Sequence, residues 1–314
     1  MSINAIIGHD SVKIQAASSI EKGRFSHAHI IVGEEGIGKS IIAKEIAIKL
    51  LGKEKNKQYV DIAEFKLQKD KKSIGIDEIK NIIEETNKKP YEGNKKVILL
   101  YSADRMTEAA QNAFLKTIEE PPKGIFIILL CEKLEKVLDT IKSRCQIYKL
   151  NRLNEEEMLL FLKNRFPDAS EDEIKTINAF SDGIPGRAER FMEDASLKEI
   201  RNNTVNILKG ICQNKLEDSL VYEDFLLKYK GEWQEVLTWF LSYIRDILVY
   251  KETGNNELII NIDKIDEIKD MAEMFSFNKL NGIINIIKDT RKKLERNVNP
   301  VLVFDSMLVK MQEV

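Results

Sequence analysis

The sequence predicts an α/β nucleotide-binding fold in its first half, followed by a region made of helices. Five short apolar runs alternate with segments of helical periodicity between residues 28 and 150. Continuous apolar runs of this kind are typical of strands that are buried on both faces of a parallel sheet. A glycine-rich stretch that ends in Lys-Ser, residues 33–40, directly follows the first run. We therefore predict an α/β P-loop domain with a parallel sheet, a small helical lid domain and an all-α C-terminal domain.

The predicted strands and helices of the first domain follow one another regularly along the chain. One helix is expected after Lys39, and a second begins near Asp77, a residue type that favours the N-cap position. A third is expected over about residues 107–120, where Pro121 and Pro122 stop it. The expected strands are residues 28–32, 59–63, 96–101, 125–131 and 146–150.

The segment after residue 150 contains helix-start signals and no further strand pattern. Asn154 with Glu157, and Ser170 with Glu173, have the spacing of capping boxes. A turn then precedes another helix, which is predicted to begin at about Gly186. These short helices predict the small lid domain.

Longer helices are predicted from about residue 197 to the end of the chain. One of them, around residues 232–252, has a broad apolar face, and another starts after Pro300. Such a face is either the core of the domain or a surface for partner subunits.

Composition excludes several classes of protein. The 314 residues include 49 basic and 51 acidic side chains, so the net charge of −2 gives no general case for nucleic-acid binding. Three scattered cysteines form no CxxC pair, which argues against a zinc site and against a disulfide framework. The first residues lack the pattern of a signal peptide, and no apolar run approaches the ~18 residues that a membrane span needs. We expect a cytoplasmic protein that does not enter a membrane.

The stretch "GEEGIGKS" matches the phosphate-binding pattern G-x-x-x-x-G-K-[S/T]. Gly33, Gly36 and Gly38 would let the backbone aim its N–H groups at phosphate oxygens. Lys39 would reach the outer phosphates, and Ser40 would ligate Mg²⁺. Two alternatives stay open: the loop binds ATP or ADP with Mg²⁺, or it keeps only its shape and binds nothing.

Further motifs identify a family. The stretches "SADRMTEAAQNAFLKTIEEPP", "IKSRCQ" and "GIPGRA" accompany "GRFSHAHIIVGEEGIGKS" and "KKSIGIDEIK". Together they resemble bacterial clamp-loader subunits of the AAA+ class, and most of all the delta prime family of DNA polymerase III subunits. The resemblance has specific motifs over about the first 190 residues. In the C-terminal region it rests on helical character and on the ending "RNVNPVLVFDSML".

The resemblance implies three domains and a set of partners. Residues 1–150 would be the AAA+ nucleotide-binding domain, 151–196 the lid, and 197–314 a helical collar through which subunits assemble. The partners would be other clamp-loader subunits of the gamma/tau and delta types. Through the assembly, the protein would act on the sliding clamp and on primer–template DNA during ATP-dependent clamp loading in DNA replication.

Two arginines take roles from the resemblance. Arg144, in Ser-Arg-Cys, would act in trans as an arginine finger on the ATP of the neighbouring subunit, a chemistry that a planar guanidinium suits. Its alternative is a structural ion pair near the end of a helix that links two strands. Arg187, in "GIPGRA", matches the second-sensor arginine, which in the family faces nucleotide in its own subunit; its alternative is an arginine on a helix surface.

The chain departs from the family's ATPases where their third strand ends in Asp-Glu. Tyr101 and Ser102 stand there instead, so both the magnesium anchor and the residue that polarises water are absent. Asp104 lies beyond those two positions and is interpreted as a loop or helix-start residue. Cys131, followed by Glu132, stands at the first-sensor position, where a thiol is only a weak hydrogen-bond donor. The four-cysteine zinc module of many relatives is also missing.

The leading hypothesis is therefore a clamp-loader subunit of the delta prime type that does not hydrolyse ATP by itself but is part of a polymerase holoenzyme. One alternative is a self-sufficient ATPase motor subunit of the gamma/tau type, which the intact loop favours and Tyr101-Ser102 opposes. The other is a pure scaffold whose phosphate loop stays empty.

Overall fold

The structure is a computed structural model that describes residues 6–53, 59–68, 71–213, 219–296 and 298–314. The chain divides into two compact units. The first contains Met1–Phe161 with Gly183–Gly186, and the second contains Leu162–Asp182 with Arg187–Val314. The segment predicted as a lid, residues 151–196, is thus shared between the two units.

A five-stranded parallel sheet forms the centre of the first unit, as predicted. The strand order is β2-β3-β4-β1-β5, and every neighbouring pair is parallel. Because parallel strands end at the same edge, the segments that follow β1, β3 and β4 lie at one edge of the sheet. The strands are β1 (Ala28–Val32), β2 (Ile62–Phe65), β3 (Lys96–Leu100), β4 (Ile125–Cys131) and β5 (Gln146–Lys149).

The strand predicted at residues 59–63 is displaced, because β2 begins only at Ile62. A turn precedes it, in which the Ile62 N–H donates to the Tyr59 carbonyl at 3.0 Å. The buried Asp61 carboxylate accepts the backbone N–H groups of Tyr91 at 2.7 Å and Glu92 at 2.9 Å. The Asp61 side chain therefore binds a loop that is distant in the sequence, and β2 begins at the next residue.

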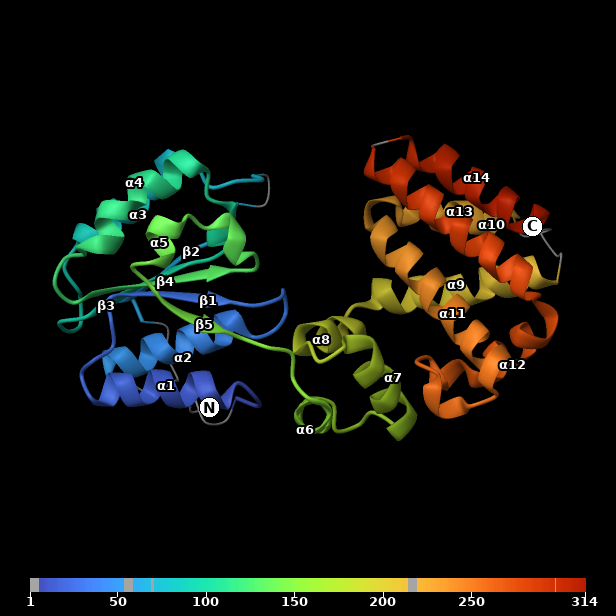
Figure 1. The fold of residues 1–314 in the computed structure, drawn as a ribbon, viewed down its shortest axis with the longest axis horizontal. Coiled ribbons are helices and arrows are strands. Elements are labelled where there is room, and N and C mark those ends of the chain that lie inside the picture. The colour runs from blue at the N-terminus through green and yellow to red at the C-terminus, as the bar shows by residue number, and fades with distance from the viewer. Residues whose placement is uncertain (1–5, 54–58, 69–70, 214–218, 297) are drawn as a thin grey trace. The chain divides into compact units, whose positions relative to one another are not determined.

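Helices cover both faces of the sheet (Figure 1). One hydrophobic cluster joins the sheet to α3 and α4, and a second joins it to α1 and α2. Helix α3 begins at Ile76, near the predicted start, but its N-cap is Gly75, and Asp77 lies in the first turn. The Glu78 carboxylate accepts the Gly75 N–H at 3.0 Å and caps this end. The helices are α1 (Asp10–Glu21), α2 (Lys39–Leu51), α3 (Ile76–Asn87), α4 (Glu108–Glu119) and α5 (Asp139–Lys142), with the 3₁₀ turns η2 (Ala103–Arg105) and η3 (Leu134–Lys136).

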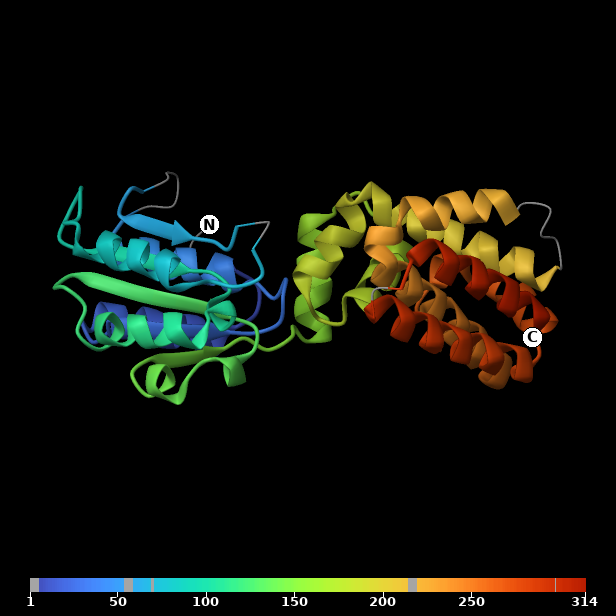
Figure 2. The same ribbon diagram turned by 90° about the horizontal axis from the view of Figure 1, so that it is seen from above.

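Every regular element in the described part of residues 151–314 is a helix, as predicted (Figure 2). The broad apolar face of α11 lies in the core, with Trp239, Phe240 and Tyr243 fully buried. Helix α6 (Glu155–Arg165) crosses the boundary between the units. The other helices are α7 (Glu171–Ser181), α8 (Pro185–Glu193), α9 (Ala195–Cys212), α10 (Ser219–Lys228), α11 (Trp233–Thr253), α12 (Ile265–Met274), α13 (Phe277–Glu295) and α14 (Pro300–Glu313), with η4 (Lys230–Glu232), η5 (Asn256–Leu258) and η6 (Ile262–Lys264).

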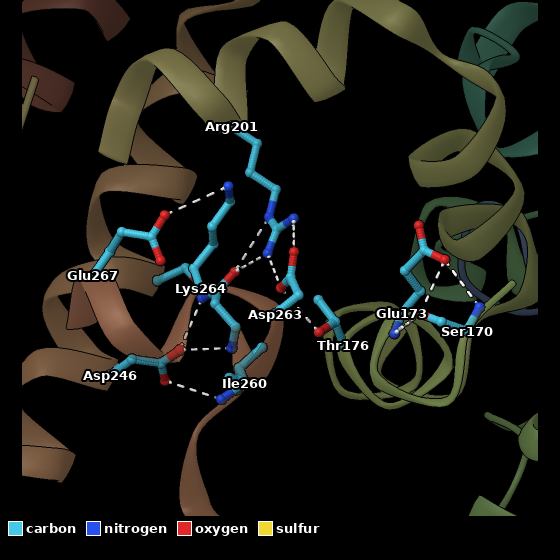
Figure 3. A network of polar contacts seen from close by, with 11 residues as sticks. Ser170, Glu173, Thr176, Arg201, Asp246, Ile260, Asp263, Lys264 and Glu267 are labelled. Atoms are coloured by element: carbon cyan, nitrogen blue, oxygen red, sulfur yellow. Dashed lines mark hydrogen bonds and ion pairs between the residues drawn. The ribbon is translucent and has the colours of Figure 1, made fainter. Parts of the chain in front are cut away.

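A buried polar network centred on Arg201 ties three helical segments of the second unit together (Figure 3). Arg201, on α9, donates from Nη1 to Asp263 Oδ2 at 2.7 Å and from Nη2 to Asn261 Oδ1 at 3.2 Å. Thr176, on α7, donates to Asp263 Oδ1 at 3.1 Å. Burial alone would raise the pKa of Asp263, but the hydrogen bonds and charge of Arg201 hold that pKa below its usual value. The network therefore joins α7, α9 and η6 through a charged pair.

His29, on β1, is a buried histidine that cannot easily take a proton. It is 1 % exposed, and its ring stacks on Phe25 with centroids 3.7 Å apart and on Tyr148 with centroids 5.4 Å apart. Nε2 lies 2.9 Å from the Ser26 carbonyl oxygen, while Nδ1 is buried without a hydrogen-bond partner. Burial lowers the pKa of His29 from 6.5 to about 4.

This histidine should make the first unit less stable in mild acid. Between pH 6.5 and 4 the unfolded chain binds a proton that the folded chain excludes, so stability falls as the pH falls. From pH 7.5 to pH 5 the loss from this one group is about 2 kcal/mol. Urea unfolding of the wild type and of His29→Phe, followed by circular dichroism at both pH values, checks it. The variant should lose about 2 kcal/mol less over this range, and identical losses would contradict the assignment.

Candidate functional site

The phosphate loop, residues 33–40, connects β1 to α2 and has a backbone that requires glycine. Gly36 has a φ of 81° and Gly38 a φ of 105°, conformations that other residues rarely adopt. At Gly33 a Cβ atom would lie 2.9 Å from Ile37 Cγ2 and 3.0 Å from the Leu150 carbonyl oxygen. Helix α2 begins at Lys39, so its positive N-terminal end faces the loop. This geometry suits the phosphates of a nucleotide.

The Lys39 side chain folds back onto the loop. Its ammonium donates to the carbonyl oxygens of Gly33 at 2.7 Å and Glu34 at 2.8 Å. Burial lowers the pKa of Lys39, while the charges of Glu132 and other nearby acids act in the opposite direction. The ammonium is thus held against the loop by hydrogen bonds to the backbone that surrounds it.

Three segments that are distant in sequence contact the loop. The Gly186 N–H donates to the Gly36 carbonyl at 2.9 Å, and a Cβ on Gly186 would lie 2.6 Å from Gly36 Cα. His9 Nε2 lies 3.1 Å from the Ile37 carbonyl oxygen. The third contact is an ion pair between Glu34 and Arg152, the latter from the segment after β5. The motif "GIPGRA" predicts that the segment of Gly186 lies near the nucleotide, whereas the sequence gives no signal for the contacts of His9 and Arg152.

The end of β3 has no carboxylate at residues 101 and 102, the two positions at which the resemblance predicts acids in a subunit that hydrolyses ATP. The Tyr101 hydroxyl donates to Glu64 Oε2 at 2.8 Å, and Glu64 also pairs with Lys44 at 2.8 Å. Burial, followed by the bond to Glu64, raises the pKa of Tyr101, so the phenol stays neutral. Ser102 adopts the left-handed conformation with a φ of 54°. These two residues do not fit the role of a magnesium anchor with an activated water.

Asp104 and Cys131 complete this edge of the sheet. Asp104 lies in η2, as predicted, and its Oδ1 accepts the Glu132 N–H at 3.3 Å. Cys131, at the end of β4, is 1 % exposed, and its carbonyl accepts the Gly33 N–H at 3.2 Å. Burial raises the pKa of the Cys131 thiol to about 12, so the thiol stays neutral.

Arg144 lies just after α5, held by side-chain and backbone partners. Its Nη2 is 3.1 Å from Glu119 Oε1 at the end of α4, and Nη1 donates to the Thr140 carbonyl at 2.9 Å. The side chain is nevertheless 36 % exposed. Arg144 therefore forms the ion pair of the structural alternative while its side chain stays partly exposed, and the trans role stays a prediction.

Arg187 belongs to the second unit, although the preceding Gly186 belongs to the first. Its Nη1 lies 4.0 Å from Asp182 Oδ2. It also lines a cavity of about 440 Å³ whose other charged lining residues are Arg190 and Glu235. The sensor role therefore stays a prediction.

Among the described residues, no group of three or more His, Cys, Asp or Glu side chains is arranged to hold a metal ion. Within the same residues, no helix has the length and apolar character of a membrane span.

Comparisons with known proteins agree on one family. The model described as "DNA polymerase III, delta subunit" matches residues 8–154, and "DNA polymerase III, delta subunit, C terminal" matches residues 197–313. DNA polymerase III subunit delta prime of Bacillus subtilis is 27% identical over 312 residues, covering 94% of each chain. The same subunit of Pseudomonas aeruginosa is 26% identical, covering 94% of this chain and 95% of its own. DNA polymerase III subunit gamma of Buchnera aphidicola is 27% identical, covering 93% and 90%.

Proposed function

The chain belongs to the DNA polymerase III delta prime family of AAA+ clamp-loader subunits, and we propose that it is a catalytically silent member of the loader. One observation carries the proposal. A phosphate loop with the full motif geometry lies beside a strand that ends in Tyr101 and Ser102 rather than in two acids. A site of this kind can bind nucleotide without turning it over.

We further propose partners from the names of the relatives. Gamma and delta prime subunits of the same polymerase are both similar to this chain, so the neighbours in the assembly would be subunits of the gamma/tau and delta types. Contacts with the sliding clamp and primer–template DNA would occur through the assembly, in the cytoplasm where the chromosome is replicated.

The proposed loss of turnover follows from the chemistry of phosphoryl transfer. Bound Mg²⁺ neutralises charge that develops on the phosphates, and a carboxylate normally anchors its shell while another orients the water. The loop from Gly33 to Ser40 would hold the phosphates of ATP or ADP. Tyr101, neutral and bonded to Glu64, supplies no charge, and Ser102 is too weak a base to activate water.

The contribution of this subunit to catalysis would be made at its neighbour's site. A guanidinium has five N–H donors in a planar fork, which suits the equatorial oxygens of a γ-phosphate in transfer. Glu119 and the Thr140 carbonyl hold Arg144 in place, and its exposed part is available to a second subunit.

Purified chain should bind a fluorescent ATP analogue but should hydrolyse ATP no faster than its Lys39→Ala variant. The reason is that the phosphate loop has the conformation that binds phosphates, whereas Tyr101 and Ser102 replace the two acids that hydrolysis needs. A coupled phosphate-release assay on the isolated chain, run beside the reconstituted loader, makes the measurement. Turnover by the isolated chain that Lys39→Ala abolishes would favour the motor-subunit alternative. Absence of nucleotide binding at millimolar concentration would favour the scaffold.

A further inference from the structure

The Glu34–Arg152 pair is a two-point contact between the phosphate loop and the segment after β5. Arg152 donates from Nε to Glu34 Oε1 at 2.6 Å and from Nη2 to Glu34 Oε2 at 2.9 Å. This fork-to-carboxylate arrangement fixes the orientation of both groups. The side chains are 45 % and 44 % exposed, so the pair contributes little to the stability of the fold.

Two groups of Glu34, its backbone carbonyl and its carboxylate, matter for phosphate binding. Its carbonyl oxygen accepts a hydrogen bond from Lys39, the cation of the phosphate-binding motif, at 2.8 Å. Its carboxylate stands in the same loop, next to Glu35. Without a cation beside it, this carboxylate would repel the polyphosphate of an incoming nucleotide.

The backbone on either side of Arg152 is anchored within the first unit. Leu150 donates its N–H to the Val32 carbonyl at 2.8 Å, immediately before the loop. Leu153 donates its N–H to the Gly183 carbonyl at 2.8 Å. Arg152 is therefore presented to Glu34 from a fixed position, which lowers the cost of holding the side chain in one geometry.

We propose that Arg152 is a positioning residue of the phosphate loop: it holds Glu34 and cancels its charge, so that the loop accepts a nucleoside di- or triphosphate. Arg152 acts through Glu34 and does not contact the phosphates. The proposal rests on the proposed function only in requiring that the loop binds nucleotide.

A double-mutant cycle on the full chain tests this role. The proteins are wild type, Arg152→Gln, Glu34→Gln and the double variant, titrated with a fluorescent ATP analogue and competed with ATP and ADP. Arg152→Gln should weaken binding about tenfold, because the Glu34 carboxylate loses the charge of Arg152 in a partly solvated site. Glu34→Gln should bind at least as well as wild type, and the double variant should return to within about threefold of it.

Arg165→Gln is the matched control. Arg165 also binds two carboxylate oxygens, of Glu189 at 2.9 Å and Glu193 at 2.6 Å, and is 48 % exposed, but it belongs to the second unit. This variant should leave nucleotide affinity unchanged. Urea midpoints of all five proteins should agree closely.

Four outcomes would overturn the proposal. A double variant as weak as Arg152→Gln would mean that Arg152 touches the phosphates itself. Equal affinity in all proteins would show that the pair has no effect on binding. A urea midpoint that falls in parallel with affinity would make the role structural. If the wild type binds no nucleotide, the nucleotide-binding proposal fails together with this one, whereas the first three outcomes leave it intact.

Discussion

Replacing Arg144 with alanine should slow ATP hydrolysis at the one neighbouring site of the assembled loader by about 10³–10⁵-fold, while the other sites keep their rates. The guanidinium would stabilise the charge that spreads over the γ-phosphate oxygens in the transition state, and alanine cannot replace it. Single-turnover hydrolysis by the reconstituted complex measures the effect directly. The fast phase should lose the amplitude of one site, and clamp loading on primed DNA should fall with it.

Two variants make this result specific. Arg144→Lys keeps the charge but lacks the planar fork, so it should recover only part of the lost rate. Arg165→Ala removes an exposed arginine of the second unit and should leave the rate and amplitude of ATP hydrolysis unchanged. Size-exclusion chromatography must show that each complex assembles. A fast phase of unchanged amplitude in an assembled Arg144→Ala complex would refute the trans role and leave the ion pair with Glu119 as the explanation.

Arg201→Ala should destabilise the second unit by about 3–5 kcal/mol, the usual cost of breaking a buried ion pair by removing one partner. Asp263 would lose its charged partner, and Asn261, which is fully buried, would lose donors to its side-chain oxygen. Contacts of the guanidinium with the Trp239 ring, 5.4 Å away, would be lost as well. Both tryptophans, Trp233 and Trp239, lie in this unit, so urea unfolding followed by tryptophan fluorescence reports on it alone.

Replacing both Arg201 and Asp263 should destabilise the second unit much less than replacing Arg201 alone. In Arg201→Met/Asp263→Leu no uncompensated charge remains, so most of the lost stability should return. The exposed pair around Arg165 gives the scale for a surface interaction, about 0–1 kcal/mol for Arg165→Ala. A loss below about 1 kcal/mol for Arg201→Ala would contradict the importance assigned to the network.

The elements that sequence predicts best are those whose signal is local. Strands β1 and β4 have the predicted bounds because uninterrupted apolar runs of that length, bounded by turn residues, are typical of buried strands. Strand β2 is displaced because Asp61 binds the backbone at Tyr91 and Glu92, some 30 residues away in the chain. Helix α3 has Gly75 rather than Asp77 as its N-cap, because Glu78 caps this end from inside the helix and a polar N-cap side chain is unnecessary.

The same distinction applies to the candidate site. The phosphate loop was predictable because its glycines and Lys39 form one continuous motif with a stereochemical meaning. The missing acids of β3 were equally visible from the family pattern. The bond from Tyr101 to Glu64 and the contacts of His9, Arg152 and Gly186 with the loop depend on how distant segments pack, and periodicity contains no information on that.

The bond between Gly186 and Gly36 has a consequence for how the loop responds to solvent. It joins two peptide groups, so it contains nothing that titrates and no net charge that ions can screen. The Glu34–Arg152 pair is the opposite case, an exposed contact between full charges. Raising the ionic strength should therefore weaken the Glu34–Arg152 ion pair and leave the Gly186–Gly36 hydrogen bond unchanged. Comparing the salt dependence of nucleotide affinity in the wild type and in the Glu34→Gln/Arg152→Gln double variant would separate the two, since only the wild type has the attachment that salt can weaken.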